Sequence, residues 1–373
     1  MSSTGVYALG FHADYQCRHS GACCTADWDV PVEIPVYRSL SEAVSGGRLR
    51  VAASAASVDP FVVEPDLPDG AAAMLDRDQD GHCVFFERGS KLCIVHRDLG
   101  EPLLPATCRH FPRVAVRDLR GTFITLSHFC PTAASMLFLD RPVEIVSQPA
   151  AFPEADYEGL VVTAHDLPPL LTPRTLMDLD GYSAWERHMV ARCARINARP
   201  ESTLATLVRD AALLRKWRPG AMPLAHAVAE LPSEEVAAPP IDTLGTSLDL
   251  HAEVMAAVPD DLKPVADENG LEDAMVAYVR PVWDDFRAPV NRYLAAKAFA
   301  SWTAYQGRGV KTIVRGLEVA LALVRVESAR QCRNAGRRLD ADRLREAFRS
   351  ADFALNHLAV GEDLARGWSS VEA

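Results

Sequence analysis

Cysteine is concentrated in about the first third of this 373-residue chain, up to residue 130. Seven of the nine cysteines lie there, namely Cys17, Cys23, Cys24, Cys83, Cys93, Cys108 and Cys130. Thiolates are soft ligands that select zinc, copper(I) or iron-sulfur clusters, and disulfides are rare inside cells. A dense group of thiols in a chain without export features therefore predicts a metal centre.

Two cysteines are expected to stand apart from this group. Cys193 shares an apolar helical face with Met189 and Ile196, so it is predicted to pack as a small buried side chain. Cys332 lies in the basic run Arg330-Gln331-Cys332-Arg333 and is expected to have no role as a ligand.

The spacing of the seven cysteines differs from that of a zinc ribbon, which pairs its ligands as C-x-x-C. Seven thiols also exceed the four that one structural zinc or one cubane cluster requires. Histidines in the same third are interpreted as further ligands, as hydrogen-bond partners of the ligands or as surface residues: His12, His19, His82, His96, His110 and His128. The ligand set stays open at this point.

Short motifs surround the cysteines. They are Cys17; Cys23-Cys24 with Trp28; Cys83-Val84-Phe85-Phe86; Leu92-Cys93-Ile94; Cys108-Arg109 with Phe111-Pro112-Arg113; Cys130-Pro131; and, more weakly, Asn291-Arg292-Tyr293-Leu294 and His357. Their order resembles the cysteine-cluster family of zinc- or iron-chelating proteins, and within it the flagellin lysine-N-methylases. The specific motifs cover only the N-terminal third, and the remainder is similar through its helical pattern.

The resemblance implies a four-iron four-sulfur (4Fe-4S) cluster whose ligands come from these seven cysteines, without telling which of them bind, and zinc is the alternative metal. It implies the transfer of a methyl group from S-adenosylmethionine to lysine amines of a protein substrate, flagellin being the first candidate. Arg109 and Arg113 are expected either to pair with a carboxylate, including that of the methyl donor, or to balance the charge of the cluster. No residue stands out as the catalytic base.

The same residues also fit a protein without enzymatic activity. In that alternative, zinc or iron only stabilises the N-terminal fold, and the helices bind a protein partner. The sequence favours the enzyme through the family resemblance alone.

One position departs from the family pattern. Ser20 stands where a cysteine is usual, which gives C-x-x-S-x-x-C-C at the start of the group. A hydroxyl is a much poorer metal ligand than a thiolate at neutral pH, so Ser20 is not predicted to be a ligand.

A calcium-loop pattern overlaps the group. Asp76, Asp78, Asp80, Gly81 and Glu87 match D-x-D-x-D-G with glutamate at position twelve. No amphipathic helix is expected before this loop, and a cysteine takes the position that usually carries an apolar residue. The preferred interpretation is an acidic turn that leads into the cysteine group.

The composition of the chain bears on whether the protein binds nucleic acids or membranes. The formal charge is −11, and no basic face is evident, so a nucleic-acid partner is not expected. The N-terminus lacks a basic start followed by an apolar run, and no apolar stretch is long enough to span a bilayer. We expect a soluble, cytoplasmic protein without membrane association.

Hydrophobic periodicity predicts an α+β fold that is mainly α. Alternation over residues 28–36 indicates an edge strand. A hairpin is predicted from two further short strands, Arg113–Val116 and Thr122–Phe129. From Trp185 onward the period becomes helical; one face runs from Val290 to Tyr305, another begins at Val310, and Asp340 is a predicted N-cap. We expect an irregular cysteine-rich domain over residues 1–150 and a helical domain over 151–373.

Overall fold

The structure is a computed structural model that describes residues 5–26, 28–52, 59–157, 159–238, 243–264 and 267–370. Helices account for about 49% of it and strands for about 12%, so the predicted α+β class is confirmed. Contacts divide the chain into two compact units. The helical unit contains residues up to 15, 114–129 and those from 133 onward, and the cysteine unit contains 16–113 and 130–132.

The boundary between the two units differs from the expected one at residue 150. Strand β1 (Val6–Leu9) pairs in parallel with β8 (Gly121–Leu126) and antiparallel with β9 (Ile145–Ser147). The first strand of the chain is thus part of a five-stranded sheet of order β10-β7-β8-β1-β9. Hydrophobic period identifies a strand but not its partner, so the sequence could not place β1 in the helical unit.

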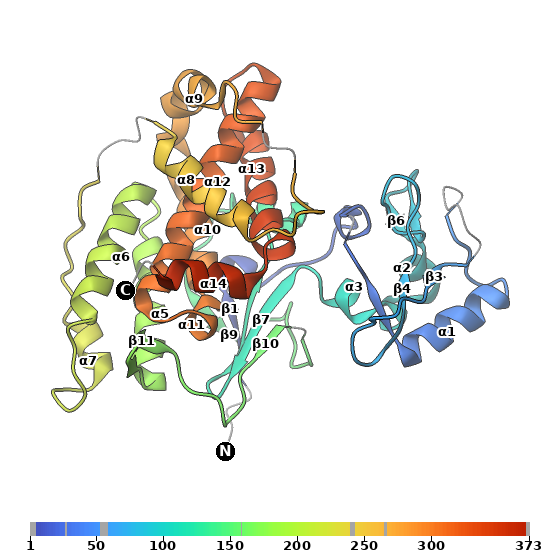
Figure 1. The fold of residues 1–373 in the computed structure, drawn as a ribbon, viewed down its shortest axis with the longest axis horizontal. Coiled ribbons are helices and arrows are strands. Elements are labelled where there is room, and N and C mark those ends of the chain that lie inside the picture. Colours follow the sequence, from blue (N-terminus) through green and yellow to red (C-terminus); the bar gives the residue numbers. More distant parts are fainter. Residues whose placement is uncertain are drawn as a thin grey trace. The chain divides into compact units, whose positions relative to one another are not determined.

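In the helical unit, helices coloured green to red in Figure 1 lie beside this sheet. Its predicted hairpin is confirmed by β7 (Arg113–Asp118) and β8. Its other elements are η1 (Gly10–His12), α4 (Pro131–Met136), β10 (Gly159–Val161), β11 (Leu170–Thr172), β12 (Thr175–Leu176), α5 (Leu179–Cys193), α6 (Pro200–Leu214), α7 (Leu224–Ala229), α8 (Gly245–Ala256), α9 (Leu271–Ala274), η4 (Met275–Val279), η5 (Arg280–Phe286), α10 (Arg287–Ala298), α11 (Thr303–Gln306), α12 (Val310–Ala335), α13 (Ala341–Phe353), η6 (Ala354–Leu358) and α14 (Gly361–Ser370).

Helix α12 forms the centre of this unit. It packs against α6, α8, α10 and α13, and most of its residues from Val310 to Cys332 are buried. The next helix begins as predicted, because the Asp340 carboxylate accepts a hydrogen bond from the Arg343 backbone N–H at 3.0 Å. No helix in the part of the chain that the structure describes has the length and apolar character needed to cross a membrane.

One predicted helix is interrupted. The apolar face from Val290 to Tyr305 predicted a single helix, but α10 ends at Ala298 and α11 begins only at Thr303. Between them Ala300 takes a positive φ of 53°, and its backbone N–H donates to the buried Glu186 carboxylate at 3.1 Å. A tertiary hydrogen bond replaces the helical one, and the prediction was wrong here.

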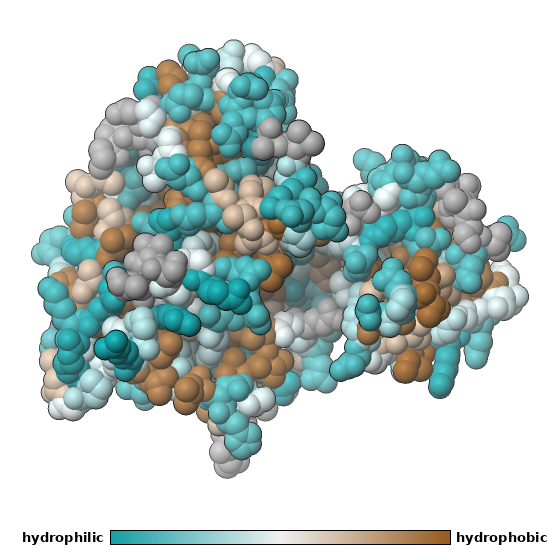
Figure 2. Space-filling view, in the orientation of Figure 1, coloured by the Kyte–Doolittle hydropathy of each residue, from teal (hydrophilic) through white to brown (hydrophobic). Residues whose placement is uncertain are grey.

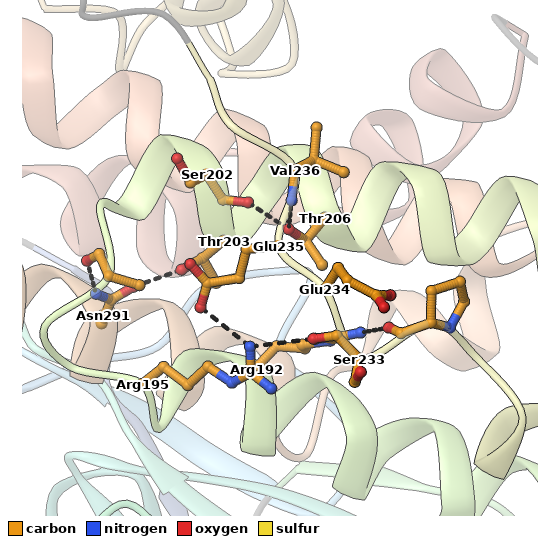
Figure 3. Close-up of polar contacts among 12 residues, drawn as sticks. Arg192, Arg195, Ser202, Thr203, Thr206, Ser233, Glu234, Glu235, Val236 and Asn291 are labelled. Carbon is orange, nitrogen blue, oxygen red and sulfur yellow. Dashed lines mark hydrogen bonds and ion pairs between the residues drawn. The ribbon is translucent and has the colours of Figure 1, made fainter.

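Two arginines, one in α5 and one just after its end, hold the loop of residues 231–238 (Figure 3). Arg192 of α5 donates to the Ser233 carbonyl at 2.9 Å, and Arg195 pairs with Glu235 at 3.1 Å. On α6 the Thr206 hydroxyl accepts from a backbone N–H of the same loop at 2.9 Å. The predicted loop is therefore ordered by side chains of α5 and α6.

The cysteine unit consists of short elements around a small apolar core. Strands β2 (Pro31–Glu33), β4 (Ala71–Leu75) and β3 (Phe61–Val62) form one sheet in that order, so β2 is at the edge as predicted. The strand is shorter than predicted, because α1 (Ile34–Ser45) begins at Ile34, with Pro35 in its first turn. The remaining elements are η2 (Ala22–Cys24), β5 (Phe86–Glu87), β6 (Leu92–Cys93), α2 (Ile94–Leu99), η3 (Glu101–Leu103) and α3 (Ala106–His110).

Candidate functional site

Thiols from four separate segments gather in the cysteine unit: Cys23, Cys24, Cys83, Cys93 and Cys108. The sulfurs of Cys23 and Cys24 are 3.9 Å apart, and the Cys93 thiol lies within hydrogen-bonding reach of Cys24. The thiols of Cys83 and Cys108 are close enough to Cys23 and Cys93 to interact with their charges. Folding therefore brings together five of the seven predicted ligands.

A tight turn places the adjacent pair. Gly21 has a φ of +76°, and a Cβ at this position would lie 2.6 Å from the Phe86 ring, so glycine is required. The Cys24 backbone N–H closes the turn onto the Gly21 carbonyl at 2.9 Å. The Cys24 carbonyl then accepts from the Cys83 N–H, also at 2.9 Å, which joins the first two segments through the backbone.

The other two cysteines are placed by secondary structure. Cys93 ends β6 and lies opposite Phe86 in the β5–β6 hairpin. Cys108 is in the middle of α3, whose first residue, Ala106, donates its N–H to the Glu33 carboxylate at 2.9 Å. Each cysteine is thus held by an element that is itself anchored to another segment.

The thiols influence one another's ionisation. Cys24 hydrogen-bonds to Cys23 and Cys93, and this lowers the pKa of Cys23, lowers that of Cys93 to about 7 and raises that of Cys24. Burial raises the pKa of Cys83 to about 12, and it also raises that of Cys108. The Cys24 thiol therefore stays protonated and is hydrogen-bonded to the thiols of Cys23 and Cys93, which ionise more easily.

The structure shows proximity of the thiols rather than a formed coordination shell. Among the residues it describes, no three His, Cys, Asp or Glu side chains stand in an arrangement that would hold a metal ion. Of the other two predicted ligands, Cys17 is exposed, with its sulfur accepting from the His19 N–H at 3.4 Å, and Cys130 is buried. Ser20 is exposed.

The two arginines predicted to contact a cofactor differ in their surroundings. Arg113 directs its guanidinium to the Arg109 and His110 carbonyls, at 3.2 and 3.5 Å, and so caps the last turn of α3. The Arg109 side chain makes no hydrogen bond or ion pair with the described residues. Only Arg109 is thus available to a carboxylate without losing a contact.

The histidines of the N-terminal third separate into two groups. The rings of His19 and His96 are 4.9 Å apart, and His82 packs edge-on against Phe86 at 5.6 Å, all within the cysteine unit. His12 and His128 belong to the helical unit and are fully buried. The sequence placed these two near cysteines, but they take part in a different cluster.

The carboxylates of the calcium-loop pattern already have partners. Asp78 accepts backbone N–H groups of the turn and pairs with Arg88 at 2.6 Å, and Asp80 pairs with the same guanidinium at 2.5 Å. Glu87 pairs with Arg97 at 3.0 Å. The interpretation as an acidic turn, held by arginines, agrees with these contacts.

A second cluster of titratable groups, the Asp352 network, lies in the helical unit. The fully buried Asp352 carboxylate accepts from Lys297 Nζ at 2.6 Å, from the Tyr293 hydroxyl at 2.7 Å, and from His128 through its backbone N–H at 2.5 Å and Nδ1 at 3.1 Å. Burial would raise the pKa of Asp352, but the Lys297 charge and the hydrogen bond from His128 outweigh it and lower that pKa. The carboxylate therefore stays ionised.

The hydrogen-bond partners of His128 determine the tautomers of His128 and His12. Because Nδ1 donates to Asp352, a neutral His128 accepts at Nε2, which lies 3.3 Å from Nε2 of His12. His12 is then the donor in that bond. Burial lowers the pKa of both histidines, so both are neutral near pH 7. Burial likewise lowers the pKa of His357 to about 4; its Nε2 lies 2.8 Å from the Ser127 hydroxyl.

From the sequence, no buried charge cluster was predicted at Asp352 and Lys297. A signal existed: Asp352 follows Phe348 by four residues, and Lys297 follows Tyr293 by four, so each charge lies on an apolar helical face. A charge on such a face indicates a buried partner, which the structure supplies. Lys297 also lines a cavity of about 50 Å³, enough for one or two water molecules.

No protein-family model matches this chain, and neither a curated protein nor a solved structure is found to be similar to it. The resemblance to the cysteine-cluster family therefore depends on the motifs themselves.

Proposed function

We propose that the cysteine unit holds a metal centre bound by thiolates. The observation that carries this proposal is the gathering of five thiols from four chain segments. The donor set fits, since sulfur ligands select zinc or iron-sulfur clusters. Cys23, Cys24, Cys83, Cys93 and Cys108 would hold the metal, and Cys17 and Cys130 complete the set of candidate ligands.

An iron-sulfur cluster is the metal group we favour. Its support is the resemblance of the motifs that contain the thiols to those of the cysteine-cluster family. The number of thiols exceeds the four that either a single zinc or one cubane cluster requires, so that number favours neither metal group. When bound, a 4Fe-4S cluster with an open iron position supplies a site for the amino-acid part of a methyl donor. The half-buried Arg109 side chain, which has no hydrogen bond or ion pair with the described residues, is our candidate to pair with the carboxylate of that donor.

The reaction we propose is methyl transfer from S-adenosylmethionine to a lysine amine of a protein, with flagellin as the first substrate to test. Its support is the resemblance of the motifs around Cys23-Cys24, Cys83, Cys93, Cys108 and Cys130. An acceptor lysine must lose its proton before it attacks the methyl group, and a pocket of low dielectric lowers the pKa of a lysine amine.

One distance favours a second candidate, a structural zinc. Tetrahedral zinc with Zn–S bonds of about 2.3 Å places its sulfurs about 3.8 Å apart. The sulfurs of Cys23 and Cys24 are 3.9 Å apart. In that case the metal would stabilise the cysteine unit, and the protein would act by binding a partner.

Anaerobic purification of the full chain separates the two candidates. The iron-sulfur enzyme is brown, contains iron and acid-labile sulfide in equal amounts, and binds S-adenosylmethionine in calorimetry. Mass spectrometry of co-expressed flagellin then shows methyl increments on lysine. A colourless protein that contains only zinc and has no affinity for S-adenosylmethionine would contradict the enzyme and support the structural zinc.

A further inference from the structure

A groove of about 490 Å³ in the cysteine unit is lined by four arginines, Arg48, Arg50, Arg88 and Arg97. Only two carboxylates share the lining, so its formal charge is +2, four positive against two negative. The whole chain carries −11. Asp78 and Asp80, which pair with Arg88, lie outside the lining, so the positive charge that the groove offers to a ligand is that of Arg48 and Arg50. The volume of the groove lies in the range of small-molecule sites.

The first pair of arginines projects from the segment after α1. Leu49, between them, is 1% exposed and belongs to the apolar core of the unit. Its backbone N–H and that of Arg48 both donate to the Ala43 carbonyl, at 3.0 and 2.8 Å. Because Leu49 points inward, Arg48 and Arg50 are exposed. Neither side chain has an ion pair or hydrogen bond with any residue that the structure describes.

The second pair is already neutralised by carboxylates. Arg88 pairs with Asp78 and Asp80, and Arg97 pairs with Glu87 and Asp98 at 3.0 and 2.7 Å. These bonds orient two guanidinium groups and occupy the acids that could otherwise pair with Arg48 and Arg50. Figure 2 shows hydrophilic residues over the tip of the β5–β6 hairpin, which carries Arg88.

The other residues that line the groove restrict the kind of ligand that it can bind. Val51, Ala52 and Ile94 give the groove an apolar part beside its charges. The guanidinium groups of Arg48 and Arg50 together match a phosphate monoester, which carries a charge of about −1.5 to −2 at neutral pH. Planar guanidinium groups also bind phosphate oxygens in a bidentate fashion.

We propose that this groove binds a small molecule that carries a phosphate monoester, with Arg48 and Arg50 as its principal contacts and the apolar part packed on Val51 and Ile94. Arg88 and Arg97, which are held by their carboxylate partners, also line the groove. Among the described residues, no thiol lines this groove.

Calorimetry of the full chain with phenyl phosphate, inorganic phosphate and succinate tests the proposal. Phenyl phosphate binds most tightly, and added salt weakens its binding. The double variant Arg48→Gln/Arg50→Gln lowers the affinity by more than about tenfold, because it removes two charge-assisted contacts. The matched control Arg366→Gln, whose side chain is 71% exposed in the other unit, leaves the affinity unchanged.

Three outcomes would overturn the proposal. One is the absence of phenyl phosphate binding, a second is equal affinity of the double variant, and the third is succinate binding as tightly as phenyl phosphate. Both arginines are exposed, so the double variant keeps the melting temperature of the parent chain. If the double variant does not fold, the single variants Arg48→Gln and Arg50→Gln decide, each with a smaller loss of affinity.

Discussion

The thiol cluster is a partly buried group of titratable side chains and the Asp352 network is centred on a fully buried carboxylate, and the two differ in the partners that the chain supplies. Asp352 accepts four hydrogen bonds and faces the positive charge of Lys297. The thiols mainly face one another, and their mutual charges help to raise the pKa of Cys83 and Cys108. The carboxylate is stabilised from within the chain, whereas the ionised thiols would repel each other.

This difference tells us which cluster to connect with function. A protein has abundant N–H and O–H donors for a carboxylate, so its own groups can supply all the hydrogen bonds that a buried aspartate needs. Several adjacent thiolates need more positive charge than one neighbouring side chain provides, and a metal ion supplies it. We therefore interpret the Asp352 network as structural and the thiol cluster as the functional centre.

The largest effect is expected for Cys24→Ala. Cys24 contacts both Cys23 and Cys93, so its removal breaks the centre of the thiol cluster. We expect nearly complete loss of bound metal and earlier unfolding of the cysteine unit in urea, because metal binding is coupled to folding. Elemental analysis per chain measures it. The control Cys193→Ala keeps its metal, and equal loss from both variants would refute the ligand assignment.

Removing the Asp352 charge from the Asp352 network should destabilise the protein nearly as strongly. Asp352→Asn leaves Lys297 without its counter-charge, and we expect the free energy of unfolding to fall by about 3–5 kcal/mol. Denaturant titration followed by circular dichroism measures this. Asp342→Asn, on the same helix with an 89% exposed side chain, is the matched control.

A double variant isolates the charge effect at Asp352. Asp352→Asn combined with Lys297→Met removes both charges, and it should recover part of the lost stability. A single variant within about 0.5 kcal/mol of the parent chain would contradict the view that the network is structural.

Acid should destabilise the helical unit through its buried histidines. Burial lowers the pKa of His357 to about 4, below the ordinary 6.5 of the unfolded chain. The unfolded state therefore binds more protons between pH 6.5 and 4, and stability falls as the pH falls through this window. Between pH 7 and pH 5 this one group contributes a loss of about 2 kcal/mol.

The variant His357→Gln tests that contribution, because glutamine can still hydrogen-bond to Ser127 but does not titrate. Its unfolding free energy, measured from pH 7 to pH 5, should fall by about 2 kcal/mol less than that of the parent chain. Identical pH profiles for the two proteins would show that His357 is not the group responsible.

The smallest effect is expected for the isolated thiol. Cys193 is fully buried in the helical core, and burial raises its pKa to about 12. Cys193→Ala should cost about 1 kcal/mol of unfolding free energy, as the loss of a small core side chain does. In the native parent chain Cys193 should resist thiol reagents. Rapid labelling of Cys193 by a thiol reagent would contradict its assignment to the core.

Local structure was predicted best where local chemistry decides it. The hairpin of β7 and β8 followed from alternation and a turn, and α13 followed from its Asp340 cap. Predictions failed where a distant group intervened. Alternation continued past Ile34, where a helix begins, and the helical face continued past Ala300, whose N–H bonds to Glu186 instead.

The sequence by itself determined which residues could bind a soft metal, since the types and motifs of the cysteines carry that information. It also determined the change from short strands to amphipathic helices. Only the tertiary structure decided that five of these thiols meet, that β1 joins the sheet of the helical unit, and that His12 and His128 belong to Asp352. The reason is physical: propensity and periodicity act over a few residues, whereas a buried charge selects its partner from distant parts of the chain.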